Sequence, residues 1–95
     1  MLLIREVFVA KPGQASKLAK LFKETWSSIK AKIMTDFVGN YNHVIMEYEV
    51  ENMAAFEKMM SEYMTKKMPK AVKEKMSSYT DMYLTGRREI YRVWN

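Results

Sequence analysis

The sequence predicts an α+β domain with the ferredoxin-like β-α-β-β-α-β order, the split βαβ plan. A repeated pattern supports this fold class. A stretch of alternating apolar residues leads into an amphipathic helix and then into a further strand, and this pattern occurs twice within 95 residues. The two halves begin with strands at residues 2–10 and 43–50. We therefore expect a single domain over residues 1–95, with an antiparallel sheet whose helices cover one face.

In the first half, the apolar strand ends at Pro12, because proline disrupts a strand ladder but is tolerated in the first turn of a helix. A helix is expected over residues 14–31, because apolar residues recur there at spacings of three and four. A strand over residues 33–38 follows. The turn at residues 39–42 joins it as a hairpin to the third strand, over residues 43–50.

In the second half, the third strand is followed by Asn52, whose side-chain oxygen can cap a helix over residues 53–68. Pro69 must end or kink that helix. A short helical piece is expected over about residues 69–78, with a loop at residues 77–81. The fourth strand is predicted over residues 87–94.

The third strand separates clearly into two sides. Val44, Met46 and Tyr48 form the better core side, and the opposite side is more polar. Both sides of the first strand are partly apolar, so the sequence does not decide which side faces the helices. A strand that is apolar on both sides also suggests that both faces of the sheet are covered. One set of helices covers one face, and the simplest second cover is another subunit. The uncovered face provisionally holds Ile4, Glu6, Phe8, His43, Ile45, Glu47 and Glu49.

Composition excludes several classes of protein. The chain has no cysteine, which rules out disulfides and thiolate metal sites and suits a cytoplasmic protein. No apolar run approaches the roughly 20 residues of a membrane span, and Arg5 and Glu6 interrupt the first one too early for a signal peptide. The net charge is +5, but the lysines fall mostly on the solvent sides of the helices. Glutamates on the uncovered face make nucleic-acid binding electrostatically poor, so we predict neither a nucleic-acid nor a membrane partner.

Two strand–helix junctions and the last strand carry a family resemblance. Residues 8–14 read Phe-Val-Ala-Lys-Pro-Gly-Gln, residues 48–56 read Tyr-Glu-Val-Glu-Asn-Met-Ala-Ala-Phe, and residues 86–91 read Gly-Arg-Arg-Glu-Ile-Tyr. In these segments, and in order and spacing along nearly the whole chain, the sequence resembles the dimeric α/β-barrel superfamily, in particular its NIPSNAP-like and antibiotic-biosynthesis-monooxygenase-like members.

The resemblance implies a homodimer whose two sheets close into a barrel, with a ligand pocket between a sheet and its helices or within the barrel. Family activities include cofactor-independent oxidation of aromatic polyketides, haem degradation and small isomerase or dehydratase reactions. The haem-degrading branch carries its haem-ligating histidine on the second helix. Residues 53–68 contain no histidine, so we predict no haem and no other cofactor.

Three titratable residues are candidates for proton transfer: His43, Glu6 and Glu47. His43 is the only histidine and has an ordinary pKa near neutrality. We expect it to face the pocket with Glu6 on the neighbouring strand as its partner, because Glu47 lies roughly 13 Å along its own strand. The alternatives stay open. His43 can be a turn-end residue bonded to backbone or solvent, and the glutamates can form ion pairs with Arg5, Arg88 or Arg92.

The ligand pocket is predicted from apolar residues, and no metal site is expected. Methionine is abundant, at ten residues, and those on the second helix can line an adaptable pocket or form plain core. The predicted pocket residues are Phe8, Ile45, Met60 and Met64. We thus predict a homodimer that binds a small apolar or aromatic molecule. The alternatives are a cofactor-independent monooxygenase or isomerase acting on an aromatic, polyketide-like substrate, and a purely structural assembly unit.

Overall fold

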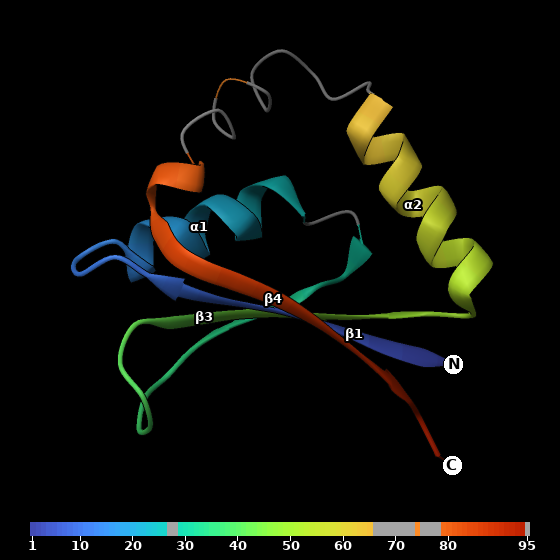
Figure 1. Ribbon diagram of the computed structural model, residues 1–95, viewed down its shortest axis with the longest axis horizontal. Coiled ribbons are helices and arrows are strands. Elements are labelled where there is room, and N and C mark those ends of the chain that lie inside the picture. The colour runs from blue at the N-terminus through green and yellow to red at the C-terminus, as the bar shows by residue number, and fades with distance from the viewer. Residues whose placement is uncertain (27–28, 66–73, 75–78, 95) are drawn as a thin grey trace.

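The structure is a computed structural model that describes residues 1–26, 29–65, 74 and 79–94. Within this part, the chain forms one four-stranded antiparallel sheet with two α-helices (Figure 1). The observed order of elements is the predicted split βαβ order, and the fold class is confirmed.

The sheet contains β1 (Leu2–Ala10), β2 (Lys32–Thr35), β3 (His43–Val50) and β4 (Tyr83–Arg92). Their order across the sheet is β2-β3-β1-β4, with every neighbouring pair antiparallel. β1 and β3, the first and third strands of the split βαβ order, occupy the two central positions. β1 therefore contacts a strand on either side along its whole length, and its side chains form the middle of both sheet faces.

Two α-helices lie on the same side of the sheet, and Figure 1 shows the other side without a helix. α1 spans Ala15–Thr25 and α2 spans Met53–Thr65. The expected cap of α2 is present, because the Asn52 side-chain oxygen accepts a hydrogen bond of 2.8 Å from the amide of Ala55. A 3-10 helix, η2 (Tyr79–Asp81), precedes β4.

Several boundaries differ from the sequence-based prediction. α1 ends at Thr25, six residues short of the predicted end, although Trp26 and Ile29 still pack against the core as expected. β2 is confined to residues 32–35, since the segment from Asp36 onward belongs to the hairpin loop. β4 begins four residues earlier than predicted. The helical piece expected over 69–78 and the predicted end of α2 beyond residue 65 lie outside the described residues.

The orientation of β1 corrects the provisional assignment of the sheet faces. β1 pairs with β3 so that Ile4, Glu6 and Phe8 stand opposite Tyr48, Met46 and Val44. These even-numbered residues face the helices, whereas we had placed Ile4, Glu6 and Phe8 on the uncovered face. The cause is the mixed character of β1, whose two sides are both apolar enough to be buried. The uncovered face of the central strands in fact holds Leu3, Arg5, Val7, Val9, His43, Ile45, Glu47 and Glu49.

The core between sheet and helices consists of two separate apolar clusters. One contains Ile4, Met46, Tyr48 and Phe56 and lies beneath α2. The other contains Ala10, Leu18, Phe22 and Val44 and lies beneath α1. β1 connects the two clusters, so the residues midway along β1 lie between them.

No helix in the described part of the chain is both long enough and apolar enough to cross a membrane.

Candidate functional site

A buried carboxylate lies between the two core clusters. Glu6 occupies β1 between Ile4 of one cluster and Phe8 beside the other, and only 7% of its surface is exposed. A charged side chain at such a position requires hydrogen bonds and an opposite charge, because burial without them is costly. Glu6 is the only charged residue among the buried residues of the described chain. This feature makes the helix side of β1 the first place to look for function.

Two side chains satisfy the Glu6 carboxylate. The Tyr48 hydroxyl, buried on β3, donates to Glu6 Oε2 at 3.1 Å. Arg88 on β4 donates from Nε to both carboxylate oxygens, at 3.0 Å and 2.8 Å. The β1–β4 register sets Glu6 directly opposite Arg88, so the pair follows from strand pairing. The predicted alternative that Glu6 pairs with Arg88 is confirmed.

Arg88 also contacts α2, which connects the helix to the sheet. Its guanidinium carbon lies 5.1 Å from the centre of the Phe56 ring, a cation–π arrangement. Its Nη2 lies 3.6 Å from the sulfur of Met60. The Arg88 side chain nevertheless remains 45% exposed. It therefore reaches from the buried carboxylate to the surface along the edge of α2.

An aromatic wall borders the other side of Glu6. Phe8 packs against Phe22 with ring centres 5.0 Å apart and against Tyr83 at 4.9 Å. Tyr79 continues the wall, at 5.7 Å from Tyr83 and 6.2 Å from Phe22. We use the name Glu6 site for Glu6, Tyr48 and Arg88 with Phe56 and Met60 on one side and this wall on the other. The site combines one charged, hydrogen-bonded group with neighbouring aromatic and apolar side chains, a composition that is also found in small-molecule sites.

Gly86 allows β4 to lie close to that wall. A side-chain carbon built at Gly86 would stand 3.1 Å from two atoms of the Phe8 ring. Phe8 is already held between Phe22 and Tyr83, so it has little room to retreat. A glycine at this position therefore leaves room for the Phe8 ring.

The structure divides the predicted pocket residues between two faces. Phe8 and Met60 lie on the helix side, within the Glu6 site. Ile45 stands opposite Val7 on the uncovered face, so within one subunit Ile45 and Phe8 cannot line the same pocket. Met64 belongs to α2, but its side chain lies outside the described part of the structure.

Glu47 lies on the uncovered face in a network of ion pairs. Arg5 places Nη2 2.6 Å from Glu47 Oε2 and Nη1 3.8 Å from Glu89 Oε1. Arg87 and the Tyr91 hydroxyl both donate to Glu89 at 2.9 Å. These hydrogen bonds lower the pKa of Glu89, and the bond to Glu89 raises the pKa of Tyr91. The predicted alternative that Glu47 pairs with Arg5 is confirmed.

His43 does not meet Glu6, which corrects the predicted partnership. The two residues stand on neighbouring strands but on opposite faces of the sheet. The His43 ring instead places Nδ1 3.1 Å from Asp36 Oδ2, and its backbone amide donates to Asp36 Oδ1 at 3.2 Å. The carbonyl of Asn40 lies 3.4 Å from the same ring nitrogen. His43 therefore closes the β2–β3 hairpin, which agrees with its interpretation as a turn-end residue.

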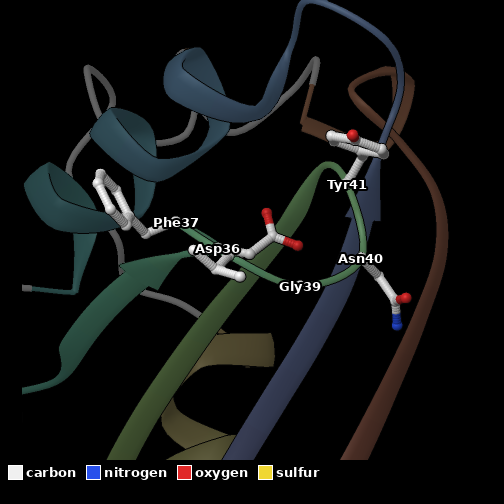
Figure 2. Close-up of a pocket in the computed structure, with 6 residues that line it drawn as sticks. Asp36, Phe37, Gly39, Asn40 and Tyr41 are labelled. Atoms are coloured by element: carbon white, nitrogen blue, oxygen red, sulfur yellow. The ribbon is translucent and has the colours of Figure 1, made fainter.

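The hairpin loop encloses a small hollow, shown in Figure 2. Its volume is about 230 Å³, and the six residues that line it form one continuous segment, from Asp36 to Tyr41. In Figure 2 the Asp36 carboxylate points into the loop while Phe37 and Tyr41 lie at its two ends. Both aromatic rings are almost fully exposed. A hollow made by one loop, with its aromatic groups turned to solvent, encloses a ligand poorly.

Sequence reasoning missed the functional partners of Glu6. Tyr48 was assigned to the core side of β3, which is correct, but its hydroxyl group was not considered. Arg88 was named only as one of three possible counter-ions. The alternation of side chains along β4, together with antiparallel strand pairing, is the signal that identifies these partners. It puts Arg88 and Tyr48 on the strand faces next to Glu6. In the described residues, no three histidine, aspartate or glutamate side chains are grouped to hold a metal ion.

Tyr79 provides a pH-dependent prediction. Burial is the main cause that raises its pKa, with further contributions from Tyr83 and the charge of Glu6. Below the tyrosine pKa of the unfolded chain, about 10, the contribution of Tyr79 to stability is complete. As the pH rises from there through the higher pKa of the folded state, that contribution is lost, because the unfolded chain ionises first. We expect Tyr79→Phe to make the unfolding free energy fall less steeply above that pH in urea titrations. Tyr41→Phe, in the exposed hairpin, is the control, and a Tyr79→Phe curve that overlays the wild-type curve would contradict the prediction.

The Asp36–His43 contact provides a second prediction. We expect Asp36→Ala and His43→Ala each to lower the free energy of unfolding by about 1 kcal/mol, since each removes one side of a half-buried hydrogen bond. The double variant should lose less than the sum by roughly 0.5–1 kcal/mol, because the two residues act on one contact. Urea denaturation of the four proteins measures this coupling. Strictly additive losses would show that the contact contributes nothing.

Comparison with solved structures identifies proteins that share this fold. A NIPSNAP-like domain protein from Burkholderia xenovorans, described as uncharacterized, superimposes with a TM-score of 0.80 at 13% identity, over 98% of this chain and 84% of that chain. A NIPSNAP family protein from Agrobacterium tumefaciens gives 0.78 at 9% identity, over 96% and 90% of the two chains. An antibiotic biosynthesis monooxygenase gives 0.70 at 12% identity, with both chains covered over 100% of their length.

These likenesses confirm the resemblance at the level of fold. The chain has the ferredoxin-like fold found in NIPSNAP domain proteins and antibiotic biosynthesis monooxygenases. No protein-family model matches the sequence, and no curated protein matches it closely enough to count as a relative. At identities near 10%, a shared fold does not establish a shared reaction.

Proposed function

We propose that this chain forms a homodimer that binds a small aromatic or apolar molecule at the Glu6 site. The observation that carries the proposal is the buried Glu6 carboxylate, fixed by Tyr48 and Arg88 between aromatic side chains. A chain of this size gains little stability from an ion pair whose desolvation offsets its attraction. A fixed charged group beside aromatic and apolar side chains is suited to orient a ligand that has an aromatic ring.

The proposed dimer uses the uncovered face of the sheet. The middle of that face is apolar along β1 and β3, with Val7 only 3% exposed and Leu3, Val9 and Ile45 half-buried. Around this strip the face carries both arginines and glutamates, so a second copy related by a twofold axis presents opposite charges to it. The apolar strip and the mixed charges both favour another copy of this chain as the cover.

A second candidate function is a cofactor-independent monooxygenase or isomerase acting on an aromatic, polyketide-like substrate. The hydrogen bond between Tyr48 and Glu6 favours it, because a positioned carboxylate with a hydroxyl partner can accept a proton from an activated ligand. His43 is held by Asp36 on the other face, where it could serve only a ligand bound inside the dimer. With a confirmed substrate, Glu6→Gln should abolish turnover if this candidate is correct, and His43→Ala tests the alternative base.

Native mass spectrometry of the freshly purified protein tests both halves of the proposal. A dimer that retains a small molecule would support both, and a monomer at micromolar concentration would exclude the dimer. Ile45→Glu should yield monomers, whereas Lys17→Gln, an equal charge change at an exposed position of α1, should not.

A thermal-shift panel of aromatic and apolar compounds tests ligand binding, and a panel without any stabilising compound would exclude ligand binding. Cytoplasmic location stays a prediction.

A further inference from the structure

Arg88 has hydrogen-bonding capacity that the described residues do not use. A guanidinium carries five N–H donors in a planar fork. Glu6 engages Nε alone, with both of its oxygens, and Met60 sulfur, a weak acceptor, lies near Nη2. Nη1 has no partner among the described residues, so the outer edge formed by Nη1 and Nη2 remains open. That edge has the geometry that binds a carboxylate through two parallel hydrogen bonds.

The surroundings of this open edge are apolar and flat. The guanidinium lies over the Phe56 ring and beside the Met60 thioether, at the side of α2 that faces the sheet. The Arg88 side chain is 45% exposed, so part of it is in contact with solvent. An arginine that is placed against an aromatic face binds planar anions well, because its charge is delocalised and weakly hydrated.

We propose that the ligand of the Glu6 site is an aromatic carboxylate whose carboxylate group binds the outer edge of Arg88. This inference rests on the proposed ligand binding at the Glu6 site and specifies its chemical class. Glu6 fixes the inner edge of Arg88 and Tyr48 fixes Glu6, so the arginine is oriented before the ligand arrives. The ring of the ligand then lies beside the half-buried Met60 side chain, next to the guanidinium that covers the buried Phe56 ring, and the net charge of +5 favours the approach of anions.

Benzoate and its neutral isostere benzamide are the probes, titrated into the intact protein and followed by NMR chemical shifts. We expect the wild type to bind benzoate more tightly than benzamide. Arg88→Gln should lower the affinity for benzoate at least about tenfold, because one charge-assisted bidentate contact is lost. The affinity for benzamide should change less than twofold. Arg92→Gln is the matched control. Arg92 lies on the same side of β4 and forms no ion pair within the described residues. The variant removes the same charge and should leave the affinity for benzoate within twofold.

Glu6→Gln provides a test that does not depend on removing Arg88. It keeps the size of the side chain and an acceptor for Tyr48 and Arg88, but it removes the negative charge that opposes the ligand carboxylate. Benzoate should therefore bind more tightly to Glu6→Gln than to the wild type, by roughly threefold or more, as like charges in a partly buried site disfavour each other.

The outcomes separate this inference from the proposed function. If benzamide binds as tightly as benzoate, or if Arg92→Gln weakens benzoate as much as Arg88→Gln does, the carboxylate assignment is wrong while aromatic binding stands. Weaker benzoate binding to Glu6→Gln would also overturn it. If neither probe binds and no aromatic compound stabilises the protein, both the inference and the ligand-binding proposal fail.

Discussion

Arg88→Gln is expected to lower the free energy of unfolding by about 2–3 kcal/mol. This is less than the loss expected when one partner of a fully buried charged pair is removed, because Arg88 is half exposed. The loss arises mainly at Glu6, which would stay buried without its counter-ion. The cation–π contact with Phe56 would disappear as well. Urea denaturation followed by far-ultraviolet circular dichroism measures the change.

Two controls identify the cause of that loss. Arg87→Gln removes an arginine from the adjacent position of β4, where the pair with Glu89 lies in solvent on the opposite face, so it should cost less than about 1 kcal/mol. Glu6→Gln combined with Arg88→Gln leaves two neutral amides and should recover part of the lost stability. Equal losses at positions 87 and 88, or no recovery in the double variant, would show that a buried unpaired carboxylate is not the cause.

The order of elements could be predicted because hydrophobic periodicity is a local property. β3 has a clear core side, with Val44, Met46 and Tyr48, and alternation alone assigns it correctly. β1 has Val7 on one side and Ile4 on the other, both buried in the structure, and alternation cannot choose between them. Only the register with β3 decides, and register depends on contacts between residues that lie far apart in the sequence.

The same limit explains why the Glu6 site was only partly foreseen. Glu6 was recognised as a candidate, but its expected partner was His43, because both were assigned to the uncovered face. Once β1 faces the helices, Glu6 is separated from His43 by the sheet itself and stands next to Tyr48 and Arg88 instead. The assignment of Asp36 to a strand concealed the partner of His43 in the same way, since Asp36 belongs to the hairpin loop.

The proposed dimer and the proposed site depend on opposite faces of β1, and this separates their tests. Arg5 and Glu47 belong to the uncovered face, whereas Glu6 and Arg88 belong to the helix side. A variant that disrupts the dimer through the uncovered face leaves the contacts of the Glu6 site intact. Ligand binding by a monomeric Ile45→Glu variant would therefore show that each subunit carries a complete site.

Phe22→Ala is expected to have the largest effect on stability, a loss of about 4 kcal/mol, within the range for truncating a buried phenylalanine. Phe22 is only 1% exposed and lies at the centre of the cluster beneath α1, in contact with Phe8 and Tyr79. Its removal leaves a cavity under a helix of only 11 residues, which has few other buried side chains to hold it. A domain of this size has a total stability of roughly 5–15 kcal/mol, so the variant should lose a large share of its stability.

Phe37→Ala is the matched control, because the same side chain is there 102% exposed on the hairpin loop. Removing an exposed ring changes the free energy of unfolding by less than about 0.5 kcal/mol, since no cavity is created. Urea denaturation of both variants at a concentration where the protein is monomeric gives the comparison. If Phe37→Ala costs as much as Phe22→Ala, the cluster beneath α1 is not the main source of stability. Phe22→Leu, which retains most of the buried volume, should recover more than half of the loss and shows that packing at this position is the cause.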